Sequence, residues 1–221
     1  MTKNSKIGLQ QAYAVETPED SIKLYKRWAD SYDEEFVAAT GYVAFQRAAE
    51  IFLQHADRPA GPVLDVGCGT GVVGLALRDG GANEVDGIDI SQEMLDEAGG
   101  KQTSSGDAVY GRLIQADLTR SIDIDDDTYA GIVSAGTFTH GHLGPESLDE
   151  LWRIAMPGAV CSIGVNAGHF DSRGFADRFS GDVAAGVIAE PDIHIIDTFS
   201  KEIDNVDEFS VQTMIVACRV L

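Results

Sequence analysis

The sequence predicts one α/β domain in which helices cover both faces of a mostly parallel β-sheet. Short apolar runs alternate with segments of helical spacing along most of the chain. The first run opens into three alternating glycines, and the last two runs have no helical segment between them. Alternating strands and helices with almost continuously apolar strands are typical of a parallel sheet that is buried on both faces. We therefore expect a three-layer sandwich with a seven-stranded sheet whose last strand is antiparallel.

The segment before the sheet is expected to be helical. Residues 1–20 are polar, and we expect them to form a flexible terminal segment. Apolar residues recur every three or four positions between 18 and 57, which predicts two helices separated near Gly41. A single domain is expected to cover 21–221, with 21–57 as its N-terminal helical cap.

The apolar runs are the expected strands, and the helices lie between them. The strands are expected at 62–66, 84–90, 109–116, 129–134, 159–165, 193–200 and 208–220. Helices are expected from Val72, after the capping residue Ser91, from Pro145 and over 170–187. Glycines weaken the prediction of the last helix. The final two strands, joined by the polar residues 201–207, are expected to pair antiparallel at one sheet edge.

The charge of the chain argues against polyanionic partners. The 16 basic and 36 acidic residues give a formal net charge of −20, and the sequence contains no basic patch. Such a surface repels nucleic acid and anionic membranes, and no apolar run approaches the roughly 20 residues that span a bilayer. The three cysteines form no CxxC pair and fit a reducing compartment. We therefore expect a cytoplasmic protein with a small-molecule partner, and the sequence leaves its oligomeric state open.

The most informative stretch runs from Val63 to Gly71, where a strand enters a glycine loop and then a helix. Glycine lets the chain turn tightly and lets a ligand approach the backbone. Ligands of open α/β sheets bind beyond the carboxyl ends of the strands. About twenty residues further on, Asp89 ends the second strand, where an acid can accept hydrogen bonds from ribose hydroxyls. These residues predict a site for a ligand that contains a ribose.

Two kinds of cofactor fit this loop. Gly69, Gly71 and Gly74 match the G-x-G-x-x-G fingerprint of dinucleotide-binding proteins, with Asp89 as its ribose acid. That alignment places Asp65 inside the first strand, where a buried charge is costly. If the strand instead ends near Asp65, the carboxylate lies at the mouth of the loop, where it can meet an ammonium group and repels a pyrophosphate. Because the chain also leaves no room for a separate substrate domain, an NAD(P)-binding oxidoreductase is kept only as the alternative.

The motifs VLDVGCGTG, GIDIS and QADL, followed by a strand that ends in SAG, resemble the class I S-adenosylmethionine (SAM)-dependent methyltransferases. The resemblance covers about residues 25–220 and implies a Rossmann-like fold with SAM as the cofactor. YKRWADSYDEEF resembles the helix that precedes the core in many small-molecule methyltransferases. The stretch from Tyr25 through VSAGTFTHGHLGP is similar to the Williams–Beuren-region methyltransferase group. One departure is Met156-Pro157-Gly158-Ala159, which we expect to form a turn and where the family has a basic residue, proline and two glycines.

The resemblance implies which residues contact the methionine part of SAM. Asp65 would bind the amino group, directly or through water. The backbone at Gly67, Cys68 and Gly69 would lie against the methionyl and ribose parts. Two residues after the fourth strand would line the methionine moiety, namely Ser134 and Ala135.

The resemblance also implies which residues contact the adenosine part. Asp89 would bind the ribose, and Ile90 would pack on adenine. Asp117 and Leu118 would meet the adenine edge, with Asp117 accepting a hydrogen bond from its amino group. Without the resemblance, the sequence predicts an exposed loop acid at Asp117 equally well.

Three aromatic residues near the N-terminus are candidates for a lid over the cofactor. Trp28 and Tyr32, together with Tyr25, would present aromatic faces that suit a sulfonium cation. Their helical spacing equally fits packing in the core. Both interpretations stay open.

Two histidines after the fourth strand are the candidate catalytic residues. His140 or His142 could remove a proton from an acceptor or donate a hydrogen bond to it, although each could instead bind nearby backbone. Asn166 and His169, after the fifth strand, are further candidates on the same geometric ground. No metal site is expected, because His-x-His here lacks partnered Cys or His residues and the acidic run at 123–127 lacks the glycine and distal glutamate of a calcium loop.

The leading functional hypothesis is a SAM-dependent methyltransferase that transfers the sulfonium methyl group to a small-molecule acceptor by in-line displacement. A third hypothesis, beside the NAD(P)-binding oxidoreductase, is a SAM-binding module without catalytic activity, because the sequence demonstrates no catalytic base. The acceptor molecule and the acceptor atom stay open.

Overall fold

The computed structural model describes residues 11–12, 15, 17–56, 59, 61–203 and 211–221. The expected flexible segment 1–20 and the connection 201–207 therefore lie partly outside the described residues. No helix in the part of the chain that the structure describes is long and apolar enough to cross a membrane.

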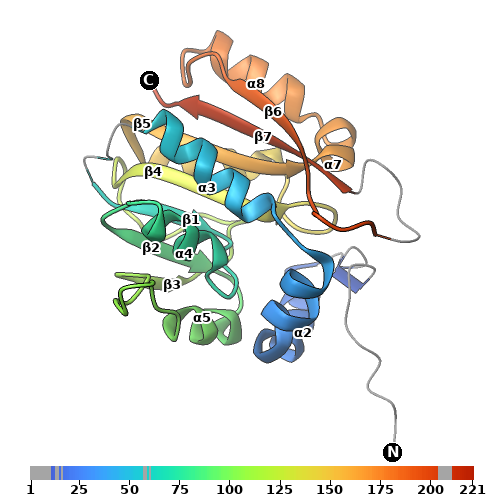
Figure 1. The fold of residues 1–221 in the computed structure, drawn as a ribbon. Coiled ribbons are helices and arrows are strands. Elements are labelled where there is room, and N and C mark those ends of the chain that lie inside the picture. The colour runs from blue at the N-terminus through green and yellow to red at the C-terminus, as the bar shows by residue number, and fades with distance from the viewer. Residues whose placement is uncertain (1–10, 13–14, 16, 57–58, 60, 204–210) are drawn as a thin grey trace, which may run out of the picture.

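A seven-stranded sheet forms the centre of the molecule, with strand order β3-β2-β1-β4-β5-β7-β6 (Figure 1). The strands are β1 (Val63–Val66), β2 (Val85–Asp89), β3 (Leu113–Gln115), β4 (Tyr129–Phe138), β5 (Ala155–Asn166), β6 (Asp192–Asp197) and β7 (Gln212–Arg219). Strands β1 to β5 pair in parallel. Strand β7 is antiparallel to both neighbours, β5 and β6. The predicted three-layer α/β fold with an antiparallel last strand is confirmed.

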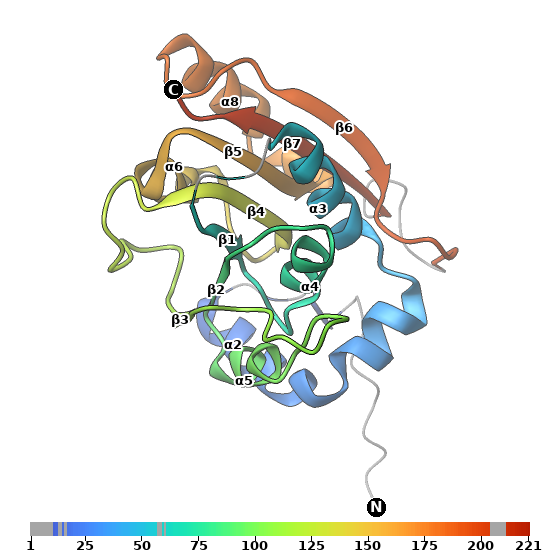
Figure 2. The same ribbon diagram turned by 60° about the vertical axis from the view of Figure 1, so that its left-hand side comes forward.

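Helices cover both faces of this sheet (Figure 2). They are α2 (Pro18–Trp28), α3 (Ala44–His55), α4 (Val72–Asp79), α5 (Gln92–Gly99), α6 (Leu148–Ile154), α7 (Ala167–Ser172) and α8 (Phe175–Ala184). Side chains of α3 and α4 pack in one buried cluster with the sheet. Side chains of α6, α7 and α8 pack in the other. The two clusters are the two cores of a sandwich that buries both faces of the sheet.

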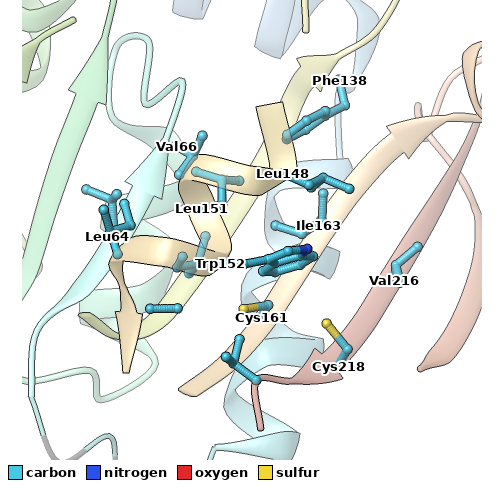
Figure 3. Packing of buried hydrophobic residues seen from close by; sticks show 14 of the residues in the cluster. Leu64, Val66, Phe138, Leu148, Leu151, Trp152, Cys161, Ile163, Val216 and Cys218 are labelled. Atoms are coloured by element: carbon cyan, nitrogen blue, oxygen red, sulfur yellow. The ribbon is translucent and has the colours of Figure 1, made fainter. Parts of the chain in front are cut away.

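The larger core lies where α6 meets the sheet (Figure 3). Leu148, Leu151 and Trp152 project from α6 toward Leu64 of β1 and Cys161 of β5. Their i, i+3, i+4 spacing places the three side chains on one helix face. Each fully buried side chain of this size contributes about 1.5–3 kcal/mol through the apolar surface it removes from water.

The N-terminal cap begins with a well-formed helix start. The side chain of Thr17 accepts a hydrogen bond from the backbone N–H of Asp20 at 3.2 Å, and Pro18 occupies the first turn, where its missing N–H costs nothing. After α2 the chain tightens into a 3₁₀ turn, η1 (Ala29–Ser31), and then widens into a π-helix, η2 (Asp33–Ala38). The cap is therefore less regular than the two expected helices.

Ionic contacts hold this cap to the core domain. Lys26 of α2 pairs with Glu93 of α5 at 2.7 Å, and Figure 1 shows the two helices side by side. Asp33 of η2 pairs with Lys101 at 2.5 Å and accepts a hydrogen bond from the Thr70 hydroxyl at 2.6 Å. Both contacts join the cap to segments next to the glycine loop.

Four element boundaries differ from the expected ones. Strand β4 continues to Phe138 instead of ending at 134, because its pairing with β5 resumes at Phe138 after a register shift. Strand β5 begins at Ala155, so the expected turn at Met156-Pro157-Gly158 is wrong, and these residues lie within the strand where its register shifts. Strand β3 is shorter than 109–116. The expected helix over 170–187 divides into α7 and α8 at Gly174, whose φ of 76° ends a helical course.

Candidate cofactor and acceptor site

A glycine bend leads from β1 into α4. Gly67, Gly69 and Gly71 have φ angles of 66°, 52° and 91°, a region that favours glycine. A Cβ atom at Gly67 would overlap Thr137 of β4, whereas one at Gly69 would meet no atom within 4 Å. The backbone at Gly67 is thus fitted against β4, and the backbone at Gly69 borders open space.

Asp65 does not lie at the mouth of this bend, and that expectation is wrong. It is an interior residue of β1 and is 0% exposed. Its Oδ2 accepts hydrogen bonds from the backbone N–H of Gly74 at 2.9 Å and from the Tyr110 hydroxyl at 2.7 Å. Burial raises the pKa of Asp65 to about 7, although both hydrogen bonds favour the charged form. The carboxyl group therefore ties the bend to α4 from inside the protein.

The hydrogen bond from Gly74 to Asp65 argues against a dinucleotide as the ligand. In the G-x-G-x-x-G fingerprint a pyrophosphate approaches the backbone N–H groups at the start of the helix. Here the Gly74 N–H in that first turn already donates to the Asp65 carboxyl. This N–H is therefore not available to a bound pyrophosphate, which disfavours a dinucleotide.

Asp89 lies at the carboxyl end of β2, directly beside the bend. Its Oδ2 accepts a hydrogen bond from the Gly69 N–H at 2.9 Å, and its Oδ1 accepts one from the Ser91 N–H at 2.8 Å. Burial raises the pKa of Asp89, while these backbone bonds lower it. The carboxylate is thus fixed in position at the place where the sequence predicted a ribose-binding acid.

A cavity of about 280 Å³ lies beyond the ends of β1, β2 and β3, and we call it the strand-end cavity. Its lining contains Asp89, Ile90, Ala116, Asp117, Leu118, Thr119, Gly67, Thr137, Pro18, Ser21, Gly141, His142, Leu143, His169 and Arg173. All four residues predicted to contact adenosine are among them. Asp117 also binds the Thr119 N–H through Oδ1 at 2.9 Å and lies 3.2 Å from Arg120.

A second cavity of about 80 Å³, the tyrosine-covered cavity, adjoins the glycine bend. It is lined by Tyr25, Tyr32, Gly67, Gly69, Asp89, Met94, Ala135, Gly136 and Thr137. Ala135 is where the sequence placed it. Ser134 is not, because β4 extends past it: the side chain is 0% exposed and donates to the Val66 carbonyl at 2.8 Å. Cys68 is also buried, with Sγ 3.9 Å from the Gly69 carbonyl.

A third cavity of about 60 Å³, the aromatic cavity, lies between the N-terminal cap and the sheet. It is lined by Ala12, Tyr25, Trp28, Tyr32, Phe36, Tyr42, Gly136, Phe138, Thr139, His142, Gly164, Asn166, Thr198, Phe199 and Thr213. Tyr25, Tyr32 and Gly136 also line the tyrosine-covered cavity. Of the three lid candidates, Trp28 is fully enclosed at 1% exposure, while the two tyrosines lie between the cavities.

His142 and Tyr25 form a hydrogen-bonded pair at the border of these cavities. Nδ1 of His142 lies 2.9 Å from the His140 carbonyl oxygen, which can only accept, so Nδ1 carries the proton. Nε2 then has its lone pair free and accepts from the Tyr25 hydroxyl at 3.1 Å. Burial lowers the pKa of His142, so the ring is neutral at pH 7. A neutral imidazole with a hydroxyl on Nε2 can take up a proton.

The other predicted polar residues have different surroundings. Among the described residues His140 lines none of the three cavities, and its ring lies 5.4 Å from that of His169. His169 is buried with Nε2 2.9 Å from the Leu143 carbonyl. Asn166 accepts from the His169 N–H at 3.1 Å and thereby caps α7. The structure thus brings His142 into the site more directly than His140.

Sequence reasoning missed several wall residues. Thr137 and Gly136 line the site because β4 extends beyond its predicted end. Tyr42 and Phe199 are far apart in sequence and meet because residues 42 and 199 form an isolated antiparallel bridge. Met94 faces the site from the helix that Ser91 caps. Only Met94 could have been found from a local pattern, because the capping residue Ser91 fixes where α5 begins and therefore which helix face carries Met94.

The strand order and the glycine bend define a Rossmann-like α/β domain, and comparisons with known proteins narrow this class. A family model described as a methyltransferase domain matches residues 63–158. Methyltransferase-like protein 27 of Homo sapiens is 28% identical over 156 residues, which cover 69% of this chain and 61% of that protein. Demethylmenaquinone methyltransferase of Symbiobacterium thermophilum is 29% identical over 157 residues, which cover 68% of this chain and 61% of that protein. The chain thus spans less than two thirds of either relative.

Solved structures agree on the fold. A chain in the complex between the Haloferax volcanii Trm112 methyltransferase activator and a methyltransferase superposes with a TM-score of 0.61 at 19% identity, covering 89% of this chain and 97% of that chain. Residues 63–158 thus match a methyltransferase domain, and the two relatives described above are methyltransferases. SAM is the cofactor that the domain match indicates.

Proposed function

We propose that the protein transfers a methyl group from SAM to a small-molecule acceptor. One observation carries the proposal: the strand-end cavity and the tyrosine-covered cavity share Gly67, Asp89 and Thr137, and the latter shares Tyr25 and Tyr32 with the aromatic cavity. The three cavities thus adjoin one another along the carboxyl edge of the sheet, and His142 lines both the strand-end and the aromatic cavity. This arrangement suits an adenosine, a methionine and an acceptor side by side.

In this proposal the strand-end cavity holds the adenosine. Asp89 accepts hydrogen bonds from the ribose hydroxyls, and Ile90 and Leu118 pack on the adenine ring. Asp117 accepts from the adenine amino group. Asp89 suits its role because two backbone N–H groups already fix the position of its carboxylate, so little side-chain freedom is lost on binding.

The tyrosine-covered cavity holds the methionine part against Gly67, Gly69 and Ala135. Asp65 acts from behind the bend, since it lines none of the three cavities. The charge of Asp89 makes the site attractive to a cation, and a bound cation would favour the charged form of Asp65. The faces of Tyr25 and Tyr32 offer a further favourable surface to a positive group.

When bound, SAM supplies a methyl group on a positively charged sulfonium, which is already an activated leaving group. The chain's own residues then have three tasks: they position the acceptor, exclude water and accept a proton. The aromatic wall performs the first two. His142 is proposed as the proton acceptor, with His140 holding its ring through the backbone carbonyl.

The proposed partner is a small molecule, because the net charge of −20 disfavours nucleic acid. The name of the demethylmenaquinone methyltransferase states a small-molecule acceptor for one relative. We further propose that 21–221 act as one domain, with 21–57 closing over the site.

Calorimetry tests the cofactor part of the proposal. The protein should bind SAM and S-adenosylhomocysteine and give no heat with NAD or NADP. Tight NAD binding without a response to SAM would favour the oxidoreductase alternative. SAM binding without methyl transfer to any member of a broad small-molecule panel would favour the non-catalytic module.

A further inference from the structure

The wall of the aromatic cavity restricts the chemistry of the acceptor. Seven of its residues are aromatic: Tyr25, Trp28, Tyr32, Phe36, Tyr42, Phe138 and Phe199. Apart from Phe138, their rings contact one another with centroids 4.9–6.4 Å apart. Tyr25 and Trp28 are stacked, and other pairs, such as Trp28 with Tyr32, are edge-to-face or tilted. An aromatic wall offers edge-to-face and offset contacts to a further planar ring. Because the enclosed space is only about 60 Å³ and a cavity that holds benzene measures roughly 150 Å³, such a ring enters only with an outward movement of the cap.

The described residues of this wall include no Asp, Glu, Lys or Arg. An anionic acceptor, such as a carboxylate or a phosphate, would lose its hydration there without gaining a counter-charge, which is costly. A protonated amine would be attracted by the rings, yet it has no lone pair with which to attack a methyl group. The acceptor that fits is therefore uncharged.

Two polar atoms of the wall could form hydrogen bonds with a ligand. Nε1 of Trp28 and Oγ1 of Thr139 are buried without a hydrogen-bond partner among the described residues. Both residues line the aromatic cavity. A buried donor without a partner costs about 1–3 kcal/mol, so an oxygen-bearing ligand in the cavity would relieve this cost.

The Tyr25–His142 pair supplies the route for a proton. The Tyr25 hydroxyl donates to Nε2 of His142 at 3.1 Å, and both residues line the aromatic cavity. A hydroxyl group of the acceptor that donates to the Tyr25 oxygen would complete a chain of two hydrogen bonds that ends on a neutral imidazole. Such a chain is of use only if the acceptor carries a proton to lose.

Resting on the methyltransferase function proposed above, we infer that the acceptor is an uncharged aromatic alcohol, a phenol or hydroxylated heteroaromatic ring, that is methylated on oxygen. The ring packs among the aromatic side chains, and its oxygen accepts from Trp28 or Thr139. In the reaction the acceptor oxygen forms the new bond to the methyl carbon, and the carbon–sulfur bond breaks with its electron pair retained by sulfur. The hydroxyl proton passes through Tyr25 to Nε2 of His142.

Binding of three small probes of similar size tests this inference. Phenol, benzoate and benzylamine are titrated by calorimetry into protein saturated with S-adenosylhomocysteine. Phenol is expected to bind at least tenfold more tightly than benzoate or benzylamine. Replacing Thr139 with the isosteric valine should weaken phenol binding several-fold and leave the affinity for S-adenosylhomocysteine unchanged. Equal or tighter binding of benzoate or benzylamine overturns the inference.

Turnover with methyl-labelled SAM provides a second test. Label is expected in anisole when phenol is the acceptor, and label on nitrogen when aniline is preferred over phenol would contradict the inference. Tyr25→Phe and His142→Gln should lower kcat at least tenfold with little change in the KM for phenol. His194→Gln, on the distant strand β6, serves as the matched control. If SAM itself does not bind, the proposed function fails; if SAM binds and phenol does not, only the inference about the acceptor fails.

Discussion

At the scale of single residues, the candidate site has one partly buried carboxyl group, Asp89, and one fully buried carboxyl group behind it, Asp65. Asp89 faces the strand-end and tyrosine-covered cavities, whereas Asp65 faces the interior and binds Gly74 and Tyr110. Both have a raised pKa because burial disfavours their charged forms. A cofactor with positive charge would stabilise the ionised state of both.

Replacing Asp89 with alanine should weaken SAM binding. The change removes charge-assisted hydrogen bonds to the ribose, each of which is worth about 1.5–3 kcal/mol, so a loss of a few kcal/mol is expected. Calorimetry with SAM measures it. Asp96→Ala on the exposed side of α5, where Asp96 contacts Gln92, is the control that should bind normally. Unchanged affinity in folded Asp89→Ala would remove Asp89 from the site.

Asp65 should make the protein less stable as the pH rises from about 4 to 7. Its pKa is about 7 in the folded chain against an ordinary value of 3.8. In this window the folded state holds a proton that the unfolded state has released, so the free energy of unfolding falls by roughly 4 kcal/mol in total. Urea unfolding at several pH values measures the slope.

The isosteric Asp65→Asn change isolates this effect from other titrating groups. His142 acts in the opposite direction, because its lowered pKa makes the folded state bind fewer protons than the unfolded state. The difference in slope between the parent and Asp65→Asn therefore belongs to Asp65. Parallel slopes would show that Asp65 titrates normally.

At the scale of elements, the glycine bend should tolerate substitution unequally. Alanine at Gly67 would overlap Thr137, whose hydroxyl is held by the Val66 carbonyl at 3.1 Å, and the expected loss is about 2–4 kcal/mol of unfolding free energy. Alanine at Gly69 meets nothing within 4 Å and should cost only the roughly 1–2 kcal/mol of its left-handed backbone. Thermal unfolding compares the two variants.

The Gly67→Ala and Gly69→Ala variants also separate an effect on stability from an effect on ligand binding. A methyl group at Gly69 would occupy part of the tyrosine-covered cavity, so Gly69→Ala should fold and bind SAM at least tenfold more weakly. Normal SAM affinity in this variant would place the methionine part elsewhere.

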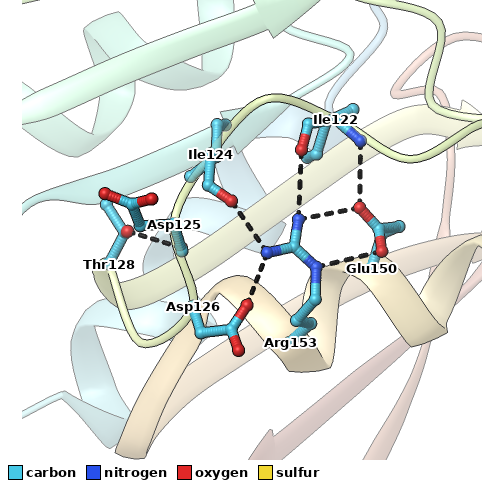
Figure 4. A network of polar contacts seen from close by, with 7 residues as sticks. All are labelled: Ile122, Ile124, Asp125, Asp126, Thr128, Glu150 and Arg153. Carbon is cyan, nitrogen blue, oxygen red and sulfur yellow. Dashed lines mark hydrogen bonds and ion pairs between the residues drawn. The ribbon is translucent and has the colours of Figure 1, made fainter.

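The loop between β3 and β4 is organised by one arginine (Figure 4). Arg153 of α6 donates to the carbonyl oxygens of Ile122 and Ile124 and to Asp126, and it forms a paired contact with Glu150 at 3.0 and 2.8 Å. Its guanidinium lowers the pKa of Glu150 to about 2. The acidic run at 123–127 thus includes one carboxylate, that of Asp126, which binds this arginine.

Arg153→Met should destabilise the protein by about 2–3 kcal/mol, because it removes the donor to the Ile122 and Ile124 carbonyl groups and the cation that pairs with Glu150. Urea unfolding measures the change. Arg47→Met removes the exposed pair of Arg47 with Glu50 and should cost less than about 1 kcal/mol. Equal effects of the two variants would show that the Arg153 network adds nothing beyond a surface ion pair.

The elements also show what could be predicted from the sequence. The sheet, the glycine bend and the position of Asp89 follow from local patterns, since apolar runs and glycines report on the backbone nearby. The burial of Asp65 does not, because its partner Tyr110 lies 45 positions away. Ser134 was misplaced for a related reason: the pairing that extends β4 to Phe138 depends on β5, not on residues 129–134.

At the scale of the whole molecule, the candidate acceptor site is assembled from distant parts of the chain. Phe36 comes from the cap, Phe138 from β4 and Phe199 from the segment directly after β6. No local window contains this combination, so the sequence could suggest a lid at Trp28 and Tyr32 but could not distinguish it from core packing. In the structure Trp28 and Tyr32 pack in a small aromatic core, and Tyr32 also lines the tyrosine-covered cavity, so the lid role stays a prediction.

The attachment of the cap has a consequence for the pace of turnover. In the proposed site a spent cofactor lies beneath Tyr25 and Tyr32, and we expect its escape to need an outward movement of α2 and η2 that separates Lys26 from Glu93 and Asp33 from Lys101. We expect product escape to be the slow step, as in many enzymes with closing lids. Because salt weakens exposed ion pairs, added sodium chloride should raise kcat moderately before it harms binding, and a first-turnover burst should shrink in parallel. If kcat does not change with salt and no burst is seen, methyl transfer is the rate-limiting step instead.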